Sequence, residues 1–203
     1  MRKLLITGFE PFGAERYNPS IEAVKLLPEE IAGTQIIKAR LPVAFKTGAE
    51  ILLQKVSEEA PDAVICVGLA GGRKAVTPEL IAVNLKNASI PDNAGQQPVW
   101  EIIEPDGEDG LFSTLPVKVI QERLEGYGFP AEISYSAGTY VCNEVMYRLL
   151  SFQKERKQNI PAGFIHVPYA SEFLPEDRKE FSLPLRKISE ALTICINAVK
   201  MMT

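Results

Sequence analysis

Short apolar runs alternate with amphipathic stretches along most of the chain. The apolar runs are rich in β-branched residues and lack strict alternation of polar and apolar positions, a pattern typical of strands covered on both faces. We expect five such strands, at residues 3–7, 35–41, 63–67, 131–135 and 163–167.

The stretches between these runs carry apolar residues at helical spacing. In residues 20–27, Ser20 precedes Ile21, Val24 and Leu27, which predicts a helix with Ser20 as its N-cap. Alternating strands and helices predict an α/β fold: a single domain over residues 1–203, built as an α/β/α sandwich around a twisted, largely parallel mixed sheet. The expected helices are 20–27, 47–59, 117–125, 142–153 and 183–201.

Residues 70–113 break this rhythm with prolines, glycines and acidic residues around one further strand candidate, 80–85. We expect this segment to leave the sheet and to lie near the active site or a subunit contact.

Loops that follow the predicted strands are expected to share one edge of the sheet. In open α/β sheets the working groups gather at the carboxyl ends of the strands. Residues 8–13, residues 68–73, the turn before Cys142 and residues 166–168 each follow a predicted strand. Four separate loops should therefore converge.

Two of these loops carry nucleophile and base candidates. Cys142 is expected at a helix N-terminus, where unpaired N–H groups and the helix dipole favour the thiolate. His166, the one histidine of the chain, ends a strand. A cysteine beside a histidine predicts a cysteine hydrolase, although each residue alone is more often structural.

Bulk composition is that of an ordinary globular protein. The chain is 46% hydrophobic and 24% charged, and its formal net charge of −4 comes with scattered basic residues, which argues against nucleic acid as a partner. The first apolar run reaches Gly8 too early for a signal peptide, and no apolar stretch approaches the roughly 20 residues that span a bilayer. Cys66, Cys142 and Cys195 form no spaced metal pair, so a cytoplasmic setting is expected.

Several ordered motifs resemble one known family nearly end to end. The motifs are TGFEPFG at 7–13, NPS at 18–20, CVGLAGGR at 66–73, TPE at 77–79, IPDN at 90–93, SAGTYVCN at 136–143 and GFIHVPY at 163–169. With these motifs the chain resembles pyroglutamyl peptidase I, also called pyrrolidone-carboxylate peptidase, a family of cysteine peptidases.

The resemblance implies a catalytic triad, which falls by motif position on Cys142, His166 and Glu79. It implies hydrolysis of N-terminal pyroglutamyl peptides through a thioester, without a metal or organic cofactor. It also implies a homo-oligomer, either a tetramer or a dimer.

The same resemblance implies a pocket in which Phe9 and Phe12 hold the pyroglutamyl ring, with backbone groups near Leu69 and Tyr140 to read the lactam. From the residues alone, both phenylalanines could instead belong to the core. The implied substrate-binding residues are Phe9, Phe12, Asn18, Leu69, Tyr140 and Val141.

Two other functions stay open at this point. The glycine-rich loops after the first and third strands are compatible with a nucleoside- or phosphate-binding α/β protein, although neither matches a dinucleotide or Walker motif. Ser89 and Leu69 stand where the family usually has arginine and glutamine. A catalytically impaired protein that binds pyroglutamyl peptides is the second alternative.

Overall fold

A mixed six-stranded sheet, in the order β2-β3-β1-β4-β8-β5, forms the centre of the molecule. The computed structural model describes residues 1–13, 15–175 and 177–201. Pairs β3-β1, β1-β4 and β4-β8 are parallel, and the edge strands β2 and β5 are antiparallel to their neighbours. The six strands are β1 (Lys3–Phe9), β2 (Glu30–Ile31), β3 (Thr34–Leu41), β4 (Ala63–Leu69), β5 (Thr77–Pro78) and β8 (Ala162–Val167). The largely parallel mixed sheet is confirmed.

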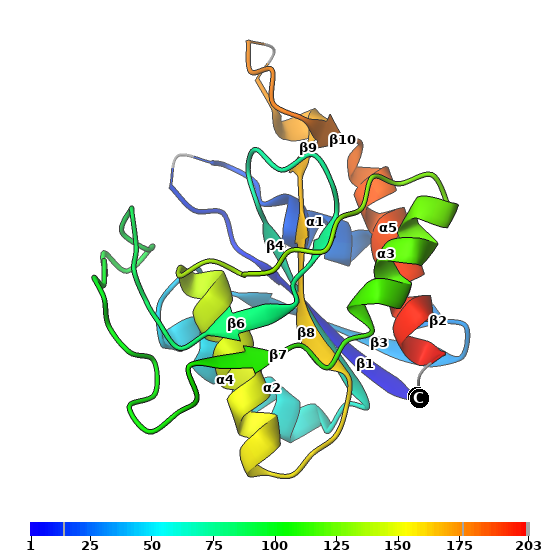
Figure 1. Ribbon diagram of the computed structural model, residues 1–203. Coiled ribbons are helices and arrows are strands. Elements are labelled where there is room, and N and C mark those ends of the chain that lie inside the picture. Colours follow the sequence, from blue (N-terminus) through cyan, green and yellow to red (C-terminus); the bar gives the residue numbers. More distant parts are fainter. Residues whose placement is uncertain (14, 176, 202–203) are drawn as a thin grey trace.

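Helices cover both faces of this sheet, as Figure 1 shows. One layer contains α1 (Pro19–Leu26), α3 (Val117–Gly126) and α5 (Leu185–Lys200), and the other contains α2 (Thr47–Glu59) and α4 (Val141–Glu155). The predicted α/β/α sandwich is therefore confirmed, with helix boundaries that differ by at most three residues from the expected ones.

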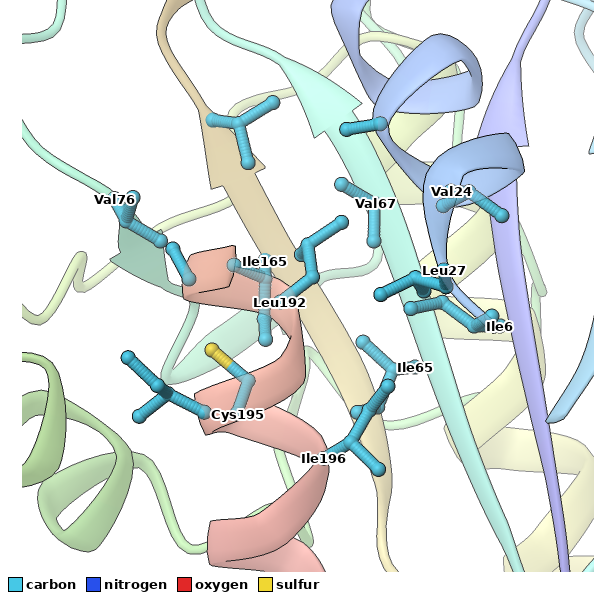
Figure 2. Close-up of a cluster of buried hydrophobic side chains, with 14 of the residues drawn as sticks. Ile6, Val24, Leu27, Ile65, Val67, Val76, Ile165, Leu192, Cys195 and Ile196 are labelled. Carbon is cyan, nitrogen blue, oxygen red and sulfur yellow. The ribbon is translucent and has the colours of Figure 1, made fainter. Parts of the chain in front are cut away.

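Alternate residues of the central strands enter two separate apolar clusters. On β4, Ile65 and Val67 face the α1, α3 and α5 layer, whereas Val64 and Cys66 face α2 and α4. Figure 2 shows part of the first cluster, in which Cys195 of α5 lies among aliphatic side chains. Cys195 is fully buried within this chain, so it serves as an apolar core residue.

The strand expected at residues 131–135 is wrong. This segment makes only isolated bridges, Val76 with Ala131 and Glu79 with Ser134. Pro78 has no N–H to donate, and the antiparallel edge strand β5 already occupies the place beside β8. Residues 131–135 therefore follow this edge without forming a regular ladder.

The expected N-cap at Ser20 is also wrong. Asn18 caps α1, its side-chain oxygen accepting from the Ser20 N–H at 3.1 Å, and Pro19 occupies the first turn, where a missing N–H costs nothing. Ser20 instead accepts a hydrogen bond from the Phe9 N–H at 2.9 Å. This bond ties the end of β1 to the start of α1.

Residues 70–113 leave the sheet only in part, because Thr77–Pro78 returns to it as the edge strand β5. The candidate strand at 80–85 is shorter than predicted, β6 (Ile81–Val83), and pairs with β7 (Gly110–Phe112), which the pattern did not indicate. The remaining short elements are β9 (Tyr169–Ala170), η1 (Ser171–Phe173) and β10 (Ser182–Leu183).

Candidate active site

The ends of β1, β4 and β8 meet the start of α4 at one edge of the sheet. Cys142 is the second residue of α4, His166 is the fifth residue of β8, and the segment after β5 carries Glu79. The loop convergence expected from topology brings Cys142 and His166 to one edge of the sheet, and Glu79, which lies on none of those four loops, joins them through its contact with His166. In the first turn of α4 the Val141 and Cys142 N–H groups have no acceptor within the helix.

Cys142 approaches the sheet at Gly68 of β4. A Cβ on Gly68 would lie 3.1 Å from the Cys142 Sγ and 2.8 Å from ring atoms of Phe164. Gly68 pairs with His166 in the β4-β8 register, and paired residues of neighbouring parallel strands point to the same face. The thiol and the imidazole therefore share one face of the sheet at one level.

His166 is held by a buried carboxylate. Its Nδ1 lies 2.7 Å from the Glu79 Oε1, and Glu79 is completely buried. Since an ionised carboxylate can only accept, the imidazole Nδ1 carries the proton and Nε2 is left with a free lone pair. The structure thus places the Glu79 carboxylate in direct contact with the His166 imidazole.

Sequence reasoning gave no role to Arg73, which also contacts Glu79. Its Nη1 donates to the Glu79 Oε1 and to the Thr77 Oγ1, each at 2.6 Å. Arg73 is the last residue of the glycine-rich motif after β4. The motif shows that an arginine is present, but only the fold shows that it contacts Glu79. The other carboxylate oxygen of Glu79, Oε2, is buried and makes no close hydrogen bond within the described part of the chain, although the Ser134 side chain lies near enough to stabilise the carboxylate.

The charges of the site follow from this burial. Burial raises the pKa of the Cys142 thiol to about 12, and the negative charge of Glu79 adds to the rise. Burial lowers the pKa of His166, against the opposing effect of its hydrogen bond to Glu79 and of the negative charge of that carboxylate. Burial alone would raise the pKa of Glu79, but the hydrogen bond from His166, the charge of that ring when it is protonated, a hydrogen bond from the Ser134 side chain and the charge of Arg73 hold it below its ordinary value.

The resting site therefore pairs a neutral thiol with a neutral imidazole beside an ionised carboxylate. The helix N-terminus expected at Cys142 is present, and its dipole favours the thiolate while burial opposes it. Cys142 does lie in the first turn of α4, but the cost of burying a charge outweighs the attraction of the helix dipole.

A small apolar pocket opens beside Cys142. All six residues that the resemblance implied for substrate binding line it, so the structure brings them together. Sequence reasoning missed Val43, which lies just beyond the carboxyl end of β3, the kind of position at which α/β sheets place their sites. The pocket is lined by Phe9, Phe12, Asn18, Val43, Leu69, Tyr140, Val141 and Cys142.

Phe9 and Phe12 differ in character. Phe9 is 2% exposed and its ring centroid lies 6.0 Å from that of Phe164, so it belongs to the core as well as to the pocket wall. Phe12 is half-buried and its ring centroid lies 6.5 Å from that of Tyr140. Only Phe12 of the two can present much of its ring to a ligand without moving.

Residues 91–93 hold two walls of the pocket. The Asn93 amide donates to the Glu10 Oε1 and to the Pro11 carbonyl, each at 2.9 Å. The Tyr140 hydroxyl donates to the Pro91 carbonyl at 3.0 Å. These hydrogen bonds connect residues 91–93 to the segment that contains Phe12 and to the segment that contains Tyr140.

The described residues contain neither a cluster suited to a metal ion nor a helix suited to a membrane. Among residues 1–13, 15–175 and 177–201, no group of three or more His, Cys, Asp or Glu side chains is arranged to hold a metal ion. Within the same ranges, no helix is both long and apolar enough to cross a membrane.

Comparison with known proteins places the site in context. The family model for pyroglutamyl peptidase matches residues 2–202. The pyrrolidone-carboxylate peptidase of Thermosipho africanus is 47% identical over 197 residues, covering 97% of this chain and 96% of that protein. The corresponding Streptococcus suis protein is 43% identical, covering 97% of this chain and 92% of its own length.

Solved structures agree with this assignment. The pyroglutamyl peptidase I of Bacillus amyloliquefaciens superposes with a TM-score of 0.94 at 42% identity, covering 98% of this chain and 94% of that one. The pyrrolidone carboxyl peptidase from Thermococcus litoralis also gives 0.94, at 39% identity, covering 99% and 94%. From a family model that spans nearly its whole length and from relatives of this identity, the chain belongs to the pyroglutamyl peptidase family.

Proposed function

We propose that this chain is a cysteine exopeptidase that removes pyroglutamate from the N-terminus of peptides, with Cys142 as nucleophile, His166 as base and Glu79 as its orienting carboxylate. One observation carries the proposal. Cys142 has an apolar pocket on one side and, across Gly68, the face of the sheet that carries the His166–Glu79 pair. A ring bound in the pocket would present its exocyclic carbonyl to the thiol.

The pocket wall supports selectivity for a neutral ring. None of its eight lining residues carries a charge at neutral pH. The Asn18 side-chain oxygen is already engaged by the Ser20 N–H and hydroxyl, so it is poorly placed to receive an ammonium. An ordinary N-terminus would lose its hydration here without gaining a counter-charge, whereas a lactam would not.

The protonation states define how the reaction would begin. With the thiol and the imidazole both neutral, the His166 Nε2 takes the thiol proton as the Cys142 Sγ attacks the pyroglutamyl carbonyl carbon. A tetrahedral oxyanion forms, and the unused N–H groups of the first turn of α4 are the donors available to it. Glu79, which accepts from Nδ1, stabilises the imidazolium.

The second half of the reaction reverses these proton transfers. The imidazolium of His166 gives its proton to the leaving amine as the C–N bond breaks, which leaves pyroglutamyl thioester on Cys142. Water, losing a proton to the neutral imidazole, then attacks the thioester carbon. The C–S bond breaks, the thiol regains its proton from His166, and free pyroglutamate leaves.

The assembly and location of the protein belong to the same proposal. The family resemblance supports a homo-oligomer, a tetramer or a dimer, and light scattering after size exclusion would measure it. The three unpaired cysteines support a reducing cytoplasm. Fractionation of cells that express the chain would test that location.

Turnover of a fluorogenic pyroglutamyl amide tests the activity and its residues together. The purified, reduced chain should release the amine from the pyroglutamyl amide and leave a prolyl amide, whose ring carries a free ammonium, intact. Cys142→Ala and His166→Ala should abolish release. Cys66→Ala is the matched control, because it removes a buried thiol outside the pocket and should retain activity.

Other outcomes would favour other functions. A folded chain that binds a pyroglutamyl amide without turning it over would support the impaired binder suggested by Ser89 and Leu69, and Ser89→Arg would be the next variant to prepare. Thermal stabilisation by a nucleoside or by inorganic phosphate would support the nucleoside- or phosphate-binding alternative. Activity that survives Cys142→Ala would contradict the proposed mechanism.

A further inference from the structure

The Arg73 contact with Glu79 has features that a surface ion pair lacks. The Arg73 side chain is 30% exposed, whereas the carboxylate that it reaches is completely buried. The Glu79 Oε1 accepts from Arg73 at 2.6 Å and lies 2.7 Å from the His166 Nδ1, so one oxygen is shared by both. The arginine therefore contacts the catalytic carboxylate directly, at the oxygen that holds the imidazole.

A second contact fixes the direction of the guanidinium. The same Arg73 Nη1 donates to the Thr77 Oγ1 at 2.6 Å, and Thr77 pairs with His166 in the β5-β8 register. The backbone N–H of Glu79 donates to the Phe164 carbonyl at 2.9 Å. Arginine and carboxylate are thus both anchored to the strand that carries the histidine.

The buried negative charge of Glu79 needs a positive partner, and Arg73 provides one. In the resting site the imidazole of His166 is neutral, so it does not balance the buried negative charge of Glu79. In the described part of the chain Glu79 forms ion pairs with Arg73 and His166 only. An unbalanced buried carboxylate would draw a proton onto His166 or take one itself, and either change would remove the base.

We propose that Arg73 is a positioning residue for His166: it holds the Glu79 carboxylate in place and balances its charge while the imidazole is neutral. The charged groups that act on His166 are Glu79 after β5 and Arg73 on the loop after β4, and the titratable Cys142 of α4 lies on the same face of the sheet. Of these, Arg73 alone is positive. This inference rests on the proposed function in one respect, that His166 acts as the base.

The single histidine makes a direct test possible. In a chain without a histidine tag, the imidazole signals in an NMR titration belong to His166 alone. Arg73→Gln removes the positive charge but keeps a side-chain donor. Because the Arg73 charge disfavours protonation of the imidazole, the midpoint for His166 should rise by roughly 0.5 to 1 unit in this variant. The acidic limb of kcat/KM should move upward by the same amount.

Two variants separate this role from a merely structural one. Arg73→Lys keeps the charge and should leave the midpoint within about 0.2 unit of the wild type, while lowering kcat/KM several-fold because a flexible ammonium loses the fixed geometry in which Nη1 reaches both Thr77 and Glu79. Lys74→Gln removes an exposed charge one residue away and should change neither quantity. A midpoint that stays fixed or falls in Arg73→Gln, or one that rises equally in Lys74→Gln, would overturn the inference.

The titration also separates this inference from the proposed function. It reports on the imidazole without requiring turnover. A raised midpoint in Arg73→Gln together with full activity in Cys142→Ala would uphold the charge balance and refute the mechanism. The opposite combination would refute the role of Arg73 alone.

Discussion

Replacement of Gly68 by alanine tests the closest contact in the site. The added Cβ would lie 2.8 Å from ring atoms of Phe164, about 0.7 Å inside the roughly 3.5 Å at which carbon atoms pack favourably. The Phe164 ring cannot withdraw freely, because its centroid lies 6.0 Å from that of Phe9 and 4.7 Å from that of His166. Overpacking of this kind costs about 1–3 kcal/mol of the free energy of unfolding.

The same methyl group would lie 3.1 Å from the Cys142 Sγ, so the thiol as well as the ring should shift. Because sub-ångström placement of reacting groups governs rate, we expect kcat/KM to fall by about ten- to a hundredfold. Urea unfolding and pyroglutamyl amide turnover measure the two effects.

Gly126→Ala is the matched control for this experiment. Gly126 ends α3, and a Cβ there would meet nothing within 4 Å. Alanine at this helical position should leave turnover unchanged and raise the free energy of unfolding by a few tenths to about 1 kcal/mol. Wild-type stability and turnover in Gly68→Ala would refute the close-approach reasoning.

Three further predictions follow from burial and capping. Asn18→Ala removes the α1 N-cap and should lower the free energy of unfolding by about 1–2 kcal/mol, measured in urea. Iodoacetamide should label the native chain at Cys142 and spare Cys66 and Cys195, which are fully buried; mass spectrometry of peptides would reveal a contrary pattern. Between pH 7 and 5.5 the unfolded chain protonates its histidine before the folded chain does, because the folded pKa is lowered, so stability should fall by up to about 1 kcal/mol in the wild type but not in His166→Asn.

Much of the fold could be predicted because its signals are local. Apolar β-branched runs marked the four central strands, and helical periodicity marked all five main helices, since each pattern reflects burial on known faces. Residues 131–135 carry the same local signal but form no strand. These residues form no strand because Pro78, more than fifty residues earlier in the sequence, cannot donate a backbone hydrogen bond at the edge that they follow.

The site could be predicted only in part, for a related reason. Cys142 and His166 belong to recognisable local contexts, and the resemblance supplied Glu79 and the pocket residues. Arg73 and Val43 were missed because their roles depend on which loops lie side by side, and this is decided by strand order. Motif position shows which residues are near each other in the chain, not which carboxylate oxygen a guanidinium will reach.

The protonation state of Cys142 shows how two local rules compete. A helix N-terminus stabilises a thiolate by about a kilocalorie per mole when exposed, and somewhat more when partly buried. Cys142 is partly exposed, but even partial desolvation of an anion costs on the order of kilocalories per mole, and Glu79 contributes a like charge on the same face of the sheet. Burial therefore outweighs the dipole, and the thiol stays protonated until His166 can accept its proton. In this site the base, and the groups that keep it neutral, should limit the rate at low pH.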